Sequence, residues 1–321
     1  QANAALEKNR DNVDALVVLA TERLAAQDAV KAIEYLDRGL KLNEKNIALQ
    51  LIKVQALESL AKMDWEEEIF RKLVGFYPET RALRHILARF YLAHGRPDAA
   101  EAEYRAIARE NPKDATAQLD VVRFVGSLKG APAATRELEA LIARDADNNE
   151  LKFALAGLKQ SQGDSKGAEA IFRAVGEKAG DTPDGLKAKG LLAAVYLARG
   201  DKSATRRLAD EVLAKDQRNE QALLLRASVA MDDRQLDSAI ADLRTILRDA
   251  PNSPRALLML GKAHELAGSL PLAQENYLKA YQAGKPAPMF GMAYAEFLLK
   301  RGQMPRAGQV AEEILQSSPE H

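Results

Sequence analysis

The stretch LARFYLAHGRPDAAEAEYRAIARENP, from Leu87 to Pro112, decides the fold of this chain. It contains two runs with apolar residues at helical spacing. The turn sequence Gly95-Arg96-Pro97 separates them, because glycine and proline interrupt regular structure. The stretch therefore predicts two antiparallel helices joined by a short turn.

The same pattern recurs nine times with a spacing of 34 residues, provided that one insertion, Pro183-Asp184-Gly185, is allowed. The nine units begin at Val13, Ile47, Arg81, Ala115, Asn149, Leu186, Glu220, Pro254 and Pro288. We number the positions of each unit from 1 to 34. We expect a first helix near positions 2–14 and a second helix near positions 16–28.

Small residues recur where the two helices of a unit must cross closely. Position 8 is alanine or glycine in seven of the nine units, and position 20 is alanine in seven. A larger side chain at such a crossing would overpack it. The second unit departs most from this pattern, since Val54 and Glu66 occupy its two small sites.

Proline provides an independent check of this register, because its ring is tolerated in the first turn of a helix but not in the interior. None of the twelve prolines interrupts the interior of a predicted helix. Pro78 and Pro112 lie in turns between units, and Pro97 lies in the first turn of a second helix. Pro183 and Pro286 are expected in connections.

The period and the pattern at positions 8, 20, 24 and 32 resemble the tetratricopeptide repeat family over nearly the whole chain. The resemblance implies an all-α, right-handed solenoid of about nine repeats. Residues 1–12 resemble the end of a preceding repeat, residues 13–182 form repeats 1–5, and residues 186–321 form repeats 6–9. Residues 183–185 are an insertion and the candidate site of a bend; an ordinary longer loop with unchanged stacking is the alternative.

The ends of the chain suggest a segment of a longer array. Terminal repeats of a solenoid usually carry a polar outer face. Here we expect Val310, Ile314 and Leu315 on the last helix to be partly uncovered.

Composition narrows the classes of function. The 46 basic and 46 acidic residues leave no net charge, which argues against a nucleic-acid partner. There is no cysteine, the four histidines do not pair at metal spacing, and no phosphate-binding or nucleophile motif occurs. No apolar run is long enough for a membrane span. We therefore expect neither enzymatic activity nor a metal or other cofactor.

A partner protein or peptide is expected in the concave groove, which the resemblance implies is lined by positions 2, 5, 9 and 12 of the first helices. Position 5 is apolar in most units, and its candidate residues are Val17, Leu51, His85, Leu119, Phe153, Leu224, Leu258 and Met292. An apolar stripe suits a partner helix or an extended apolar segment. The alternative is that these side chains pack between adjacent first helices.

Two further features are candidates for partner binding. Arg89 and Arg123 at position 9, with His85 one turn from Arg89, could receive a carboxylate, unless Asp120 neutralises them. Met289 and Met292 open the ninth unit, where methionine suits either an adaptable binding surface or a core.

The segments Leu191–Asp216 and Asp237–Gly268 resemble long proteobacterial repeat proteins of the cell envelope, several of which are linked to exopolysaccharide or protein-sorting export. This resemblance favours a periplasmic or envelope location over a cytoplasmic one. We expect a protein-binding scaffold in an envelope assembly. The alternatives are the regulatory arm of a larger exporter or enzyme, and self-association through uncapped ends.

Overall fold

The computed structural model describes residues 2–285 and 287–317, and all regular secondary structure in these ranges is α-helical. A short helix, α1 (Ala2–Lys8), precedes nine helix pairs. The first helices of the pairs are α2 (Val13–Ala25), α4 (Ile47–Glu58), α6 (Arg81–Ala93), α8 (Ala115–Lys129), α10 (Asn149–Ser161), α12 (Pro183–Ala198), α14 (Glu220–Asp232), α16 (Pro254–Leu266) and α18 (Pro288–Lys300). The second helices are α3 (Ala29–Leu42), α5 (Met63–Phe76), α7 (Pro97–Glu110), α9 (Ala131–Arg144), α11 (Ser165–Ala179), α13 (Lys202–Leu213), α15 (Leu236–Asp249), α17 (Leu270–Ala283) and α19 (Met304–Ser317).

These bounds confirm the predicted series of helical hairpins. Eight of the nine first helices begin at the residue predicted to open the unit, and all nine second helices begin at position 17, one residue later than predicted. Polar side chains at position 34 explain where first helices start. The side chains of Asn12, Asn46 and Asn219 accept hydrogen bonds from the backbone of the first helical turn, at 2.9, 3.1 and 3.1 Å.

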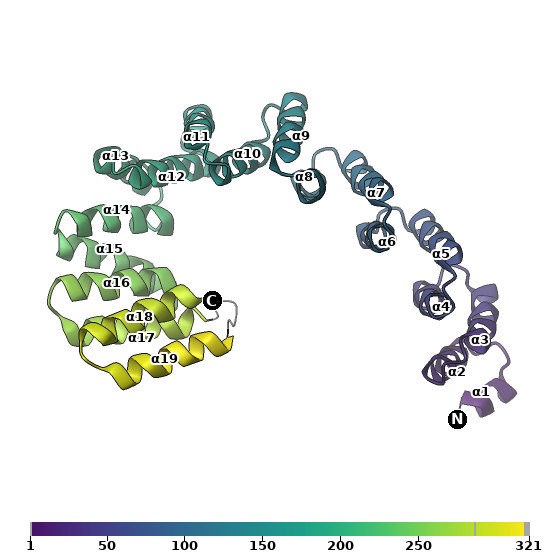
Figure 1. Ribbon diagram of the computed structural model, residues 1–321. Coiled ribbons are helices and arrows are strands. Elements are labelled where there is room, and N and C mark those ends of the chain that lie inside the picture. Colours follow the sequence, from purple (N-terminus) through teal and green to yellow (C-terminus); the bar gives the residue numbers. More distant parts are fainter. Residues whose placement is uncertain (1, 286, 318–321) are drawn as a thin grey trace. The chain divides into compact units, whose positions relative to one another are not determined.

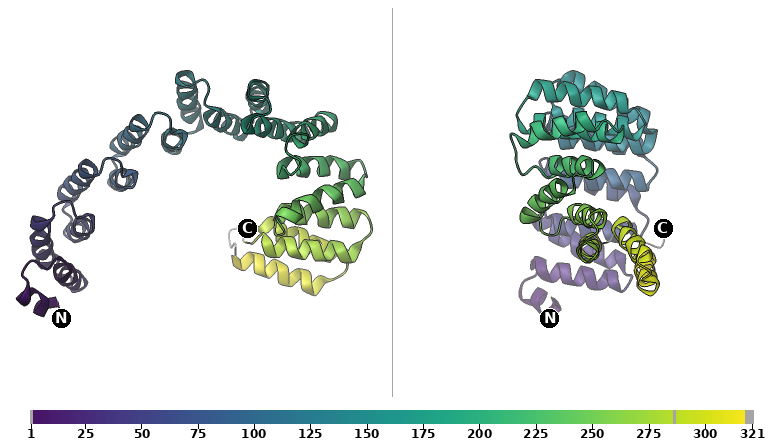
Figure 2. Two further views of the ribbon diagram at one scale, coloured as in Figure 1. Left: turned by 180° about the vertical axis from the view of Figure 1, so that it is seen from behind. Right: turned by 90° about the vertical axis from the view of Figure 1, so that its left-hand side faces the viewer.

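The chain divides into two compact units, unit 1 (Gln1–Leu151) and unit 2 (Lys152–His321). In unit 1 the helices α2, α4, α6 and α8 form one layer and α3, α5, α7 and α9 form the other, as Figures 1 and 2 show. In unit 2 consecutive first helices contact one another: α12 with α14, α14 with α16, and α16 with α18. In unit 1 α2 contacts α4 in the same way. The first helices therefore form the inner layer of each unit. We call the side of this layer that faces away from the second helices the inner face.

Close crossings between the two helices of each pair form the core. The residues at position 20 are all buried: Ala32, Glu66, Ala100, Ala134, Ala168, Thr205, Ala239, Ala273 and Ala307. At position 8 Ala20, Ala88 and Ala227 are fully buried. Large side chains at position 24, such as Leu36 and Phe172, fill the space beside these small residues.

Two expectations about loops and ends are wrong. The inserted residues 183–185 form the first turn of α12, so Pro183 opens a helix and does not lie in a connection. Val310 and Ile314 are buried against α18, and of the three residues expected to be uncovered only Leu315 is exposed. Pro286, also expected in a connection, lies outside the described residues.

Hydrogen bonds and ion pairs around one glutamate join consecutive repeats in both units. Between repeats 2 and 3, Arg71 donates to the Tyr91 hydroxyl, which donates to Glu67, and Arg96 pairs with Glu67 as well. The hydrogen bond from Arg96 is the first cause of the lowered pKa of Glu67. The same arrangement recurs between repeats 5 and 6 with Glu169, Arg173, Tyr196 and Arg199.

Glu66 is the one acidic residue at a crossing site of position 20. Its side chain is buried, and burial, reinforced by the charge of Glu58, raises its pKa. The charge of His94 opposes this shift. Glu66 therefore weakens unit 1 whenever it is ionised.

We expect Ala100→Leu to reduce the free energy of unfolding of unit 1 by about 1–3 kcal/mol, because the added side chain overpacks a crossing. Ala102→Leu, two residues along the same helix at an exposed position, is the matched control and is expected to change it by less than about 0.5 kcal/mol. Urea unfolding followed by circular dichroism measures both. Equal effects of the two variants would contradict the crossing model.

We expect Glu66→Gln to stabilise unit 1 at neutral pH by about 1–2 kcal/mol, since the amide keeps the shape and removes a buried charge. A carboxyl whose pKa is raised in the folded state does not destabilise the fold while it is protonated. The free energy of unfolding falls as the pH rises from the ordinary pKa of a glutamate through the raised pKa of the folded state. The gain should therefore be small near pH 4 and full at pH 8. A gain that does not depend on pH in urea unfolding would rule out this cause.

Candidate functional site

The predicted position-5 residues lie on the first helices of both units and differ in exposure. Leu258 is buried, Met292 is 62% exposed, and the other candidates are half-buried. The half-buried residues are Val17, Leu51, His85, Leu119, Phe153 and Leu224. Each of them combines a packed part with an accessible edge.

The packed part of these side chains belongs to the hydrophobic cores. Val17 and Leu51 pack against separate clusters of buried residues in unit 1. Phe153 and Leu224 pack against the large central cluster of unit 2. Side chains of this kind contribute to folding and still present apolar surface to a partner.

The three polar candidates of unit 1 have different surroundings. Arg123 is exposed and forms an ion pair with Asp120. This contact agrees with the alternative in which Asp120 neutralises the arginine. The ring of His85 packs against Tyr104, with 5.4 Å between the ring centroids. Arg89 is exposed. An exposed ion pair of this kind contributes little to stability, and it reduces the charge that Arg123 offers to an acidic partner.

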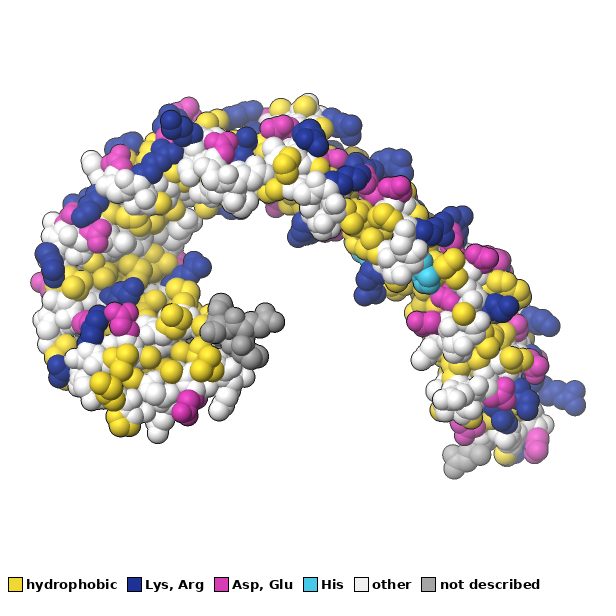
Figure 3. Space-filling model, in the orientation of Figure 1, with side chains coloured by type: hydrophobic (Ala, Val, Ile, Leu, Met, Phe, Trp, Pro, Cys, Tyr) yellow, Lys and Arg dark blue, Asp and Glu magenta, His cyan; other side chains and the backbone are white. Residues whose placement is uncertain are grey.

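The methionines that open the ninth repeat lie on the surface. Met289 is 55% exposed, and Phe290 between Met289 and Met292 is buried in the core. Apolar side chains are gathered on the surface of α17 to α19 in the space-filling view (Figure 3). Met304 and Leu315 on α19 are also exposed.

A cavity of about 750 Å³ opens on the inner face of unit 2, where α12, α14 and α16 begin. Its apolar lining includes Leu186 and the predicted residue Leu224. Its polar lining includes Lys187, Gln221 and Arg255, which occupy position 2 in three successive repeats. The volume lies in the range of ordinary ligand pockets.

The carboxylates that line the cavity already have local hydrogen bonds. The hydroxyl of Ser253 donates to Glu220 at 2.8 Å, and the amide of Asn219 donates to Asp216 at 3.1 Å. Among the described residues, by contrast, neither Lys187 nor Arg255 forms an ion pair. The ammonium of Lys187 lies 4.4 Å from the centroid of the Phe153 ring. The lining therefore carries two cations and two carboxylates, and the hydrogen bonds from Ser253 and Asn219 orient the carboxylates without neutralising them.

Gln221, which lines this cavity, packs against Gly190 of the preceding repeat. Gly190 at position 5 lies beneath the amide of Gln221, so that a Cβ at Gly190 would be 3.2 Å from Gln221 Oε1. The apolar column is thus interrupted by a polar group between Phe153 and Leu224. Sequence reasoning recognised position 2 as part of the groove but did not single out its residues. The residues at position 2 of repeats 6, 7 and 8, which are Lys187, Gln221 and Arg255, would have indicated the polar side of the cavity.

Two other kinds of site were tested in the part of the chain that the structure describes. It contains no cluster of three or more histidine and carboxylate side chains with the geometry to hold a metal ion. Within residues 2–285 and 287–317 no helix has the length and apolar character needed to cross a membrane.

Two family models, both described as tetratricopeptide repeat, match the sequence. One matches residues 191–254, 224–288 and 258–321, and the other matches residues 80–124. Together they cover more than half of the chain and include both units. No curated protein sequence matches the chain.

Several solved structures have a similar fold. A chain of the APC/C hetero-tetramer Cut9–Hcn1 matches 97% of this chain with a TM-score of 0.57 at 16% identity. This chain covers 62% of the length of that one. The human IFIT1 dimer with m7Gppp-AAAA matches 99% of this chain and 81% of its own, with a TM-score of 0.54 at 14% identity. A tetratricopeptide repeat protein from Parabacteroides merdae matches 89% of this chain and 98% of its own, with a TM-score of 0.49 at 15% identity. At these identities the likeness concerns the fold alone.

Adjacent leucines on α14 separate packing from binding. We expect Leu223→Ala to lower the free energy of unfolding by about 2–5 kcal/mol, because Leu223 is fully in the core. Leu224→Ala should cost only about 1 kcal/mol, since part of that side chain remains in solvent. Urea unfolding of the two variants provides the comparison. Equal losses would show that the position-5 column serves packing alone.

Proposed function

Because the chain belongs to the tetratricopeptide repeat family, we propose that it is a non-catalytic scaffold whose inner face binds an extended segment of a partner protein. Stacked helical repeats present long continuous surfaces, and such surfaces are used to hold other proteins. The cavity on α12, α14 and α16 is the proposed centre of the binding surface.

The observation that carries this proposal is the pair of cations beside Leu224. Lys187 and Arg255 line the cavity, and in the described part of the chain no carboxylate pairs with either. Leu186 and Leu224 supply apolar contact between them. The cavity therefore suits a segment that places an apolar side chain against Leu224 and a carboxylate beside Arg255, since arginine binds carboxylates through two parallel hydrogen bonds.

The remaining candidates from the sequence extend this surface. Phe153 neighbours the cavity through its contact with Lys187. Leu51, Leu119 and Val17 provide apolar edges on the inner face of unit 1. We propose that these edges bind a partner segment at unit 1, and that the cavity provides the specificity of unit 2.

The setting that we propose is a bacterial envelope assembly, in the periplasm. The support is the resemblance of segments Leu191–Asp216 and Asp237–Gly268 to envelope repeat proteins. The alternative setting is the scaffolding arm of a larger exopolysaccharide exporter or enzyme. The full gene distinguishes the two, because a barrel, transferase or membrane domain would favour the alternative.

Self-association is the alternative mode of binding. The exposed Met289 and Met292 on α18 favour it, because methionine adapts to many apolar surfaces. It would give a mass that rises with protein concentration in light scattering, which binding of an extended segment does not require.

Selection from a library of displayed 12-residue peptides tests the proposed cavity. We expect the selected peptides to combine an apolar residue with Asp or Glu, and to lose at least about tenfold in affinity on Leu224→Glu or Arg255→Glu. Arg244→Glu changes an exposed cation on α15, outside the cavity, and is the matched control. Circular dichroism confirms that each variant is folded. Peptides that bind all the variants equally would refute the site.

A further inference from the structure

A second pocket lies in unit 1 on the opposite side of the repeats, between the second helices α7 and α9 and above α8. Its volume is about 440 Å³. Ala108, Pro112, Val121 and Leu141 give it a mostly apolar lining. This volume is sufficient for one large side chain or a small ligand.

Gln118 explains why the pocket exists. It occupies position 4 of its repeat, where Leu16, Leu223 and Leu257 are buried in other repeats. The amide nitrogen of Gln118 donates to the carbonyl oxygen of Pro112 at 2.6 Å, which draws the side chain toward the turn before α8. The space that a leucine would fill is left open.

The same hydrogen bond leaves an unsatisfied acceptor. Gln118 is 8% exposed, and its Oε1 is buried with no hydrogen-bond donor. The bond from the amide nitrogen fixes which atom is the oxygen, because a flipped amide would place two acceptors together. A buried acceptor without a donor is costly, so a ligand that displaces the atoms covering Gln118 Oε1 and supplies an N–H or O–H group satisfies it.

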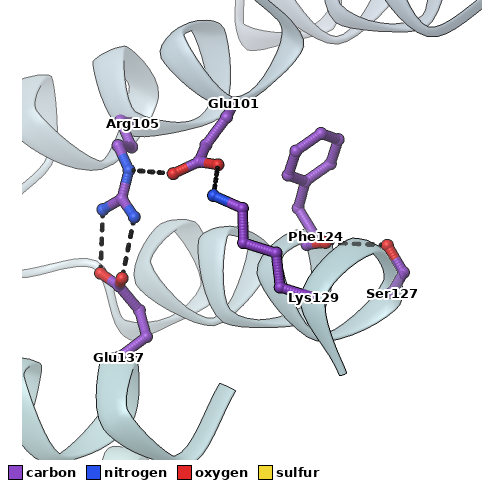
Figure 4. Close-up of polar contacts among 6 residues, drawn as sticks. All are labelled: Glu101, Arg105, Phe124, Ser127, Lys129 and Glu137. Atoms are coloured by element: carbon purple, nitrogen blue, oxygen red, sulfur yellow. Dashed lines mark hydrogen bonds and ion pairs between the residues drawn. The ribbon is translucent and has the colours of Figure 1, made fainter. Parts of the chain in front are cut away.

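The charges of the pocket divide into paired and unpaired groups. Arg105 donates to Glu101 at 2.8 Å and to both oxygens of Glu137 at 2.9 and 2.8 Å, and Lys129 completes the network at 2.7 Å from Glu101 (Figure 4). These hydrogen bonds keep the pKa of Glu137 and of Glu101 below their ordinary values, so both carboxylates remain ionised and neutralise Arg105.

Two other arginines at the pocket are not neutralised in this way. Arg109 on α7 and Arg144 on α9 line it, and among the described residues neither forms an ion pair. Asp145 also lines the pocket and accepts a hydrogen bond from Asn148 at 3.2 Å. With Glu137 and Asp145 counted against the three arginines, the lining carries an excess of one positive charge.

We propose that this pocket binds an acidic segment of a partner protein through an anchoring tryptophan or tyrosine side chain. The ring fills the apolar space beside Val121 and Leu141, and its N–H or O–H donates to Gln118 Oε1. Carboxylates that flank the ring pair with Arg109 and Arg144. The site shares no lining residue with the inner-face cavity.

Repeat 2 contains a natural control. Gln50 at position 4 donates to the carbonyl oxygen of Glu44 at 2.9 Å and also lines a pocket. In the part of the chain that the structure describes, however, its Oε1 is not both buried and unpaired. Two of the three lysines that line that pocket are neutralised, since Lys53 pairs with Asp37 at 2.6 Å and Lys72 with Glu68 at 2.9 Å.

The test uses the peptide acetyl-Asp-Glu-Trp-Glu-Asp-amide and methyl-labelled protein, with NMR to locate the contact. We expect shifts at the methyl groups of Val121 and Leu141, with the methyl groups of Leu224 unchanged. Replacing Trp by Phe should weaken binding about tenfold or more, because Gln118 Oε1 then stays without a donor. A peptide with lysines in place of the acidic residues should not bind.

Three variants complete the design. Gln118→Leu, which introduces the residue of other repeats and is expected to fold, should abolish binding, whereas Gln50→Leu should leave it unchanged. The double change Arg109→Glu and Arg144→Glu should weaken it at least about tenfold. The proposal is overturned if the peptide shifts neither Val121 nor Leu141, if it shifts only Leu224, or if Gln118→Leu binds as tightly as the parent chain. Equal affinity of the Trp and Phe peptides overturns the role of Gln118.

Discussion

The close approach of paired helices at positions 8 and 20 is the constraint on which the rest of the structure depends. Fully buried alanines such as Ala20 and Ala32 let two backbones come near enough for Leu36 to fill the remaining gap. Because every pair solves its packing locally, the array grows by addition and needs no larger core. The inner face is only partly bound by this requirement, because side chains such as Phe153 and Leu224 pack against the core with one part and leave another part in solvent.

Most of the fold was predictable because its rules are local. Small residues at the crossings, prolines in turns and the 34-residue period placed the start of eight first helices to within one residue. The errors arose where a residue type permits two structures. Proline suits a loop and a helix start equally, which hid the helical state of Pro183. Ile314 is buried because Gly291 leaves room for it, since a Cβ at Gly291 would lie 2.7 Å from its Cδ1.

The sites were less predictable, because they depend on contacts between repeats. Periodicity placed Phe153 and Leu224 on the inner face, but it could not show that Lys187 lies over the Phe153 ring or that Gln221 covers Gly190. In the same way, Gln118 looks like an ordinary polar residue in the sequence. Its importance depends on a hydrogen bond to Pro112 that directs its amide and isolates its oxygen.

The extra turn at the start of α12 shows how one repeat of such an array can acquire a surface that differs from those of the other repeats. Three added residues precede position 1, so the phase of every later crossing is preserved, while Pro183 reaches the rim of the inner-face cavity. An insertion at the start of a first helix therefore alters the surface and keeps the register of the repeats that follow. Evolution, or a protein engineer, can diversify the recognition of such an array one repeat at a time by adding or removing residues at these junctions.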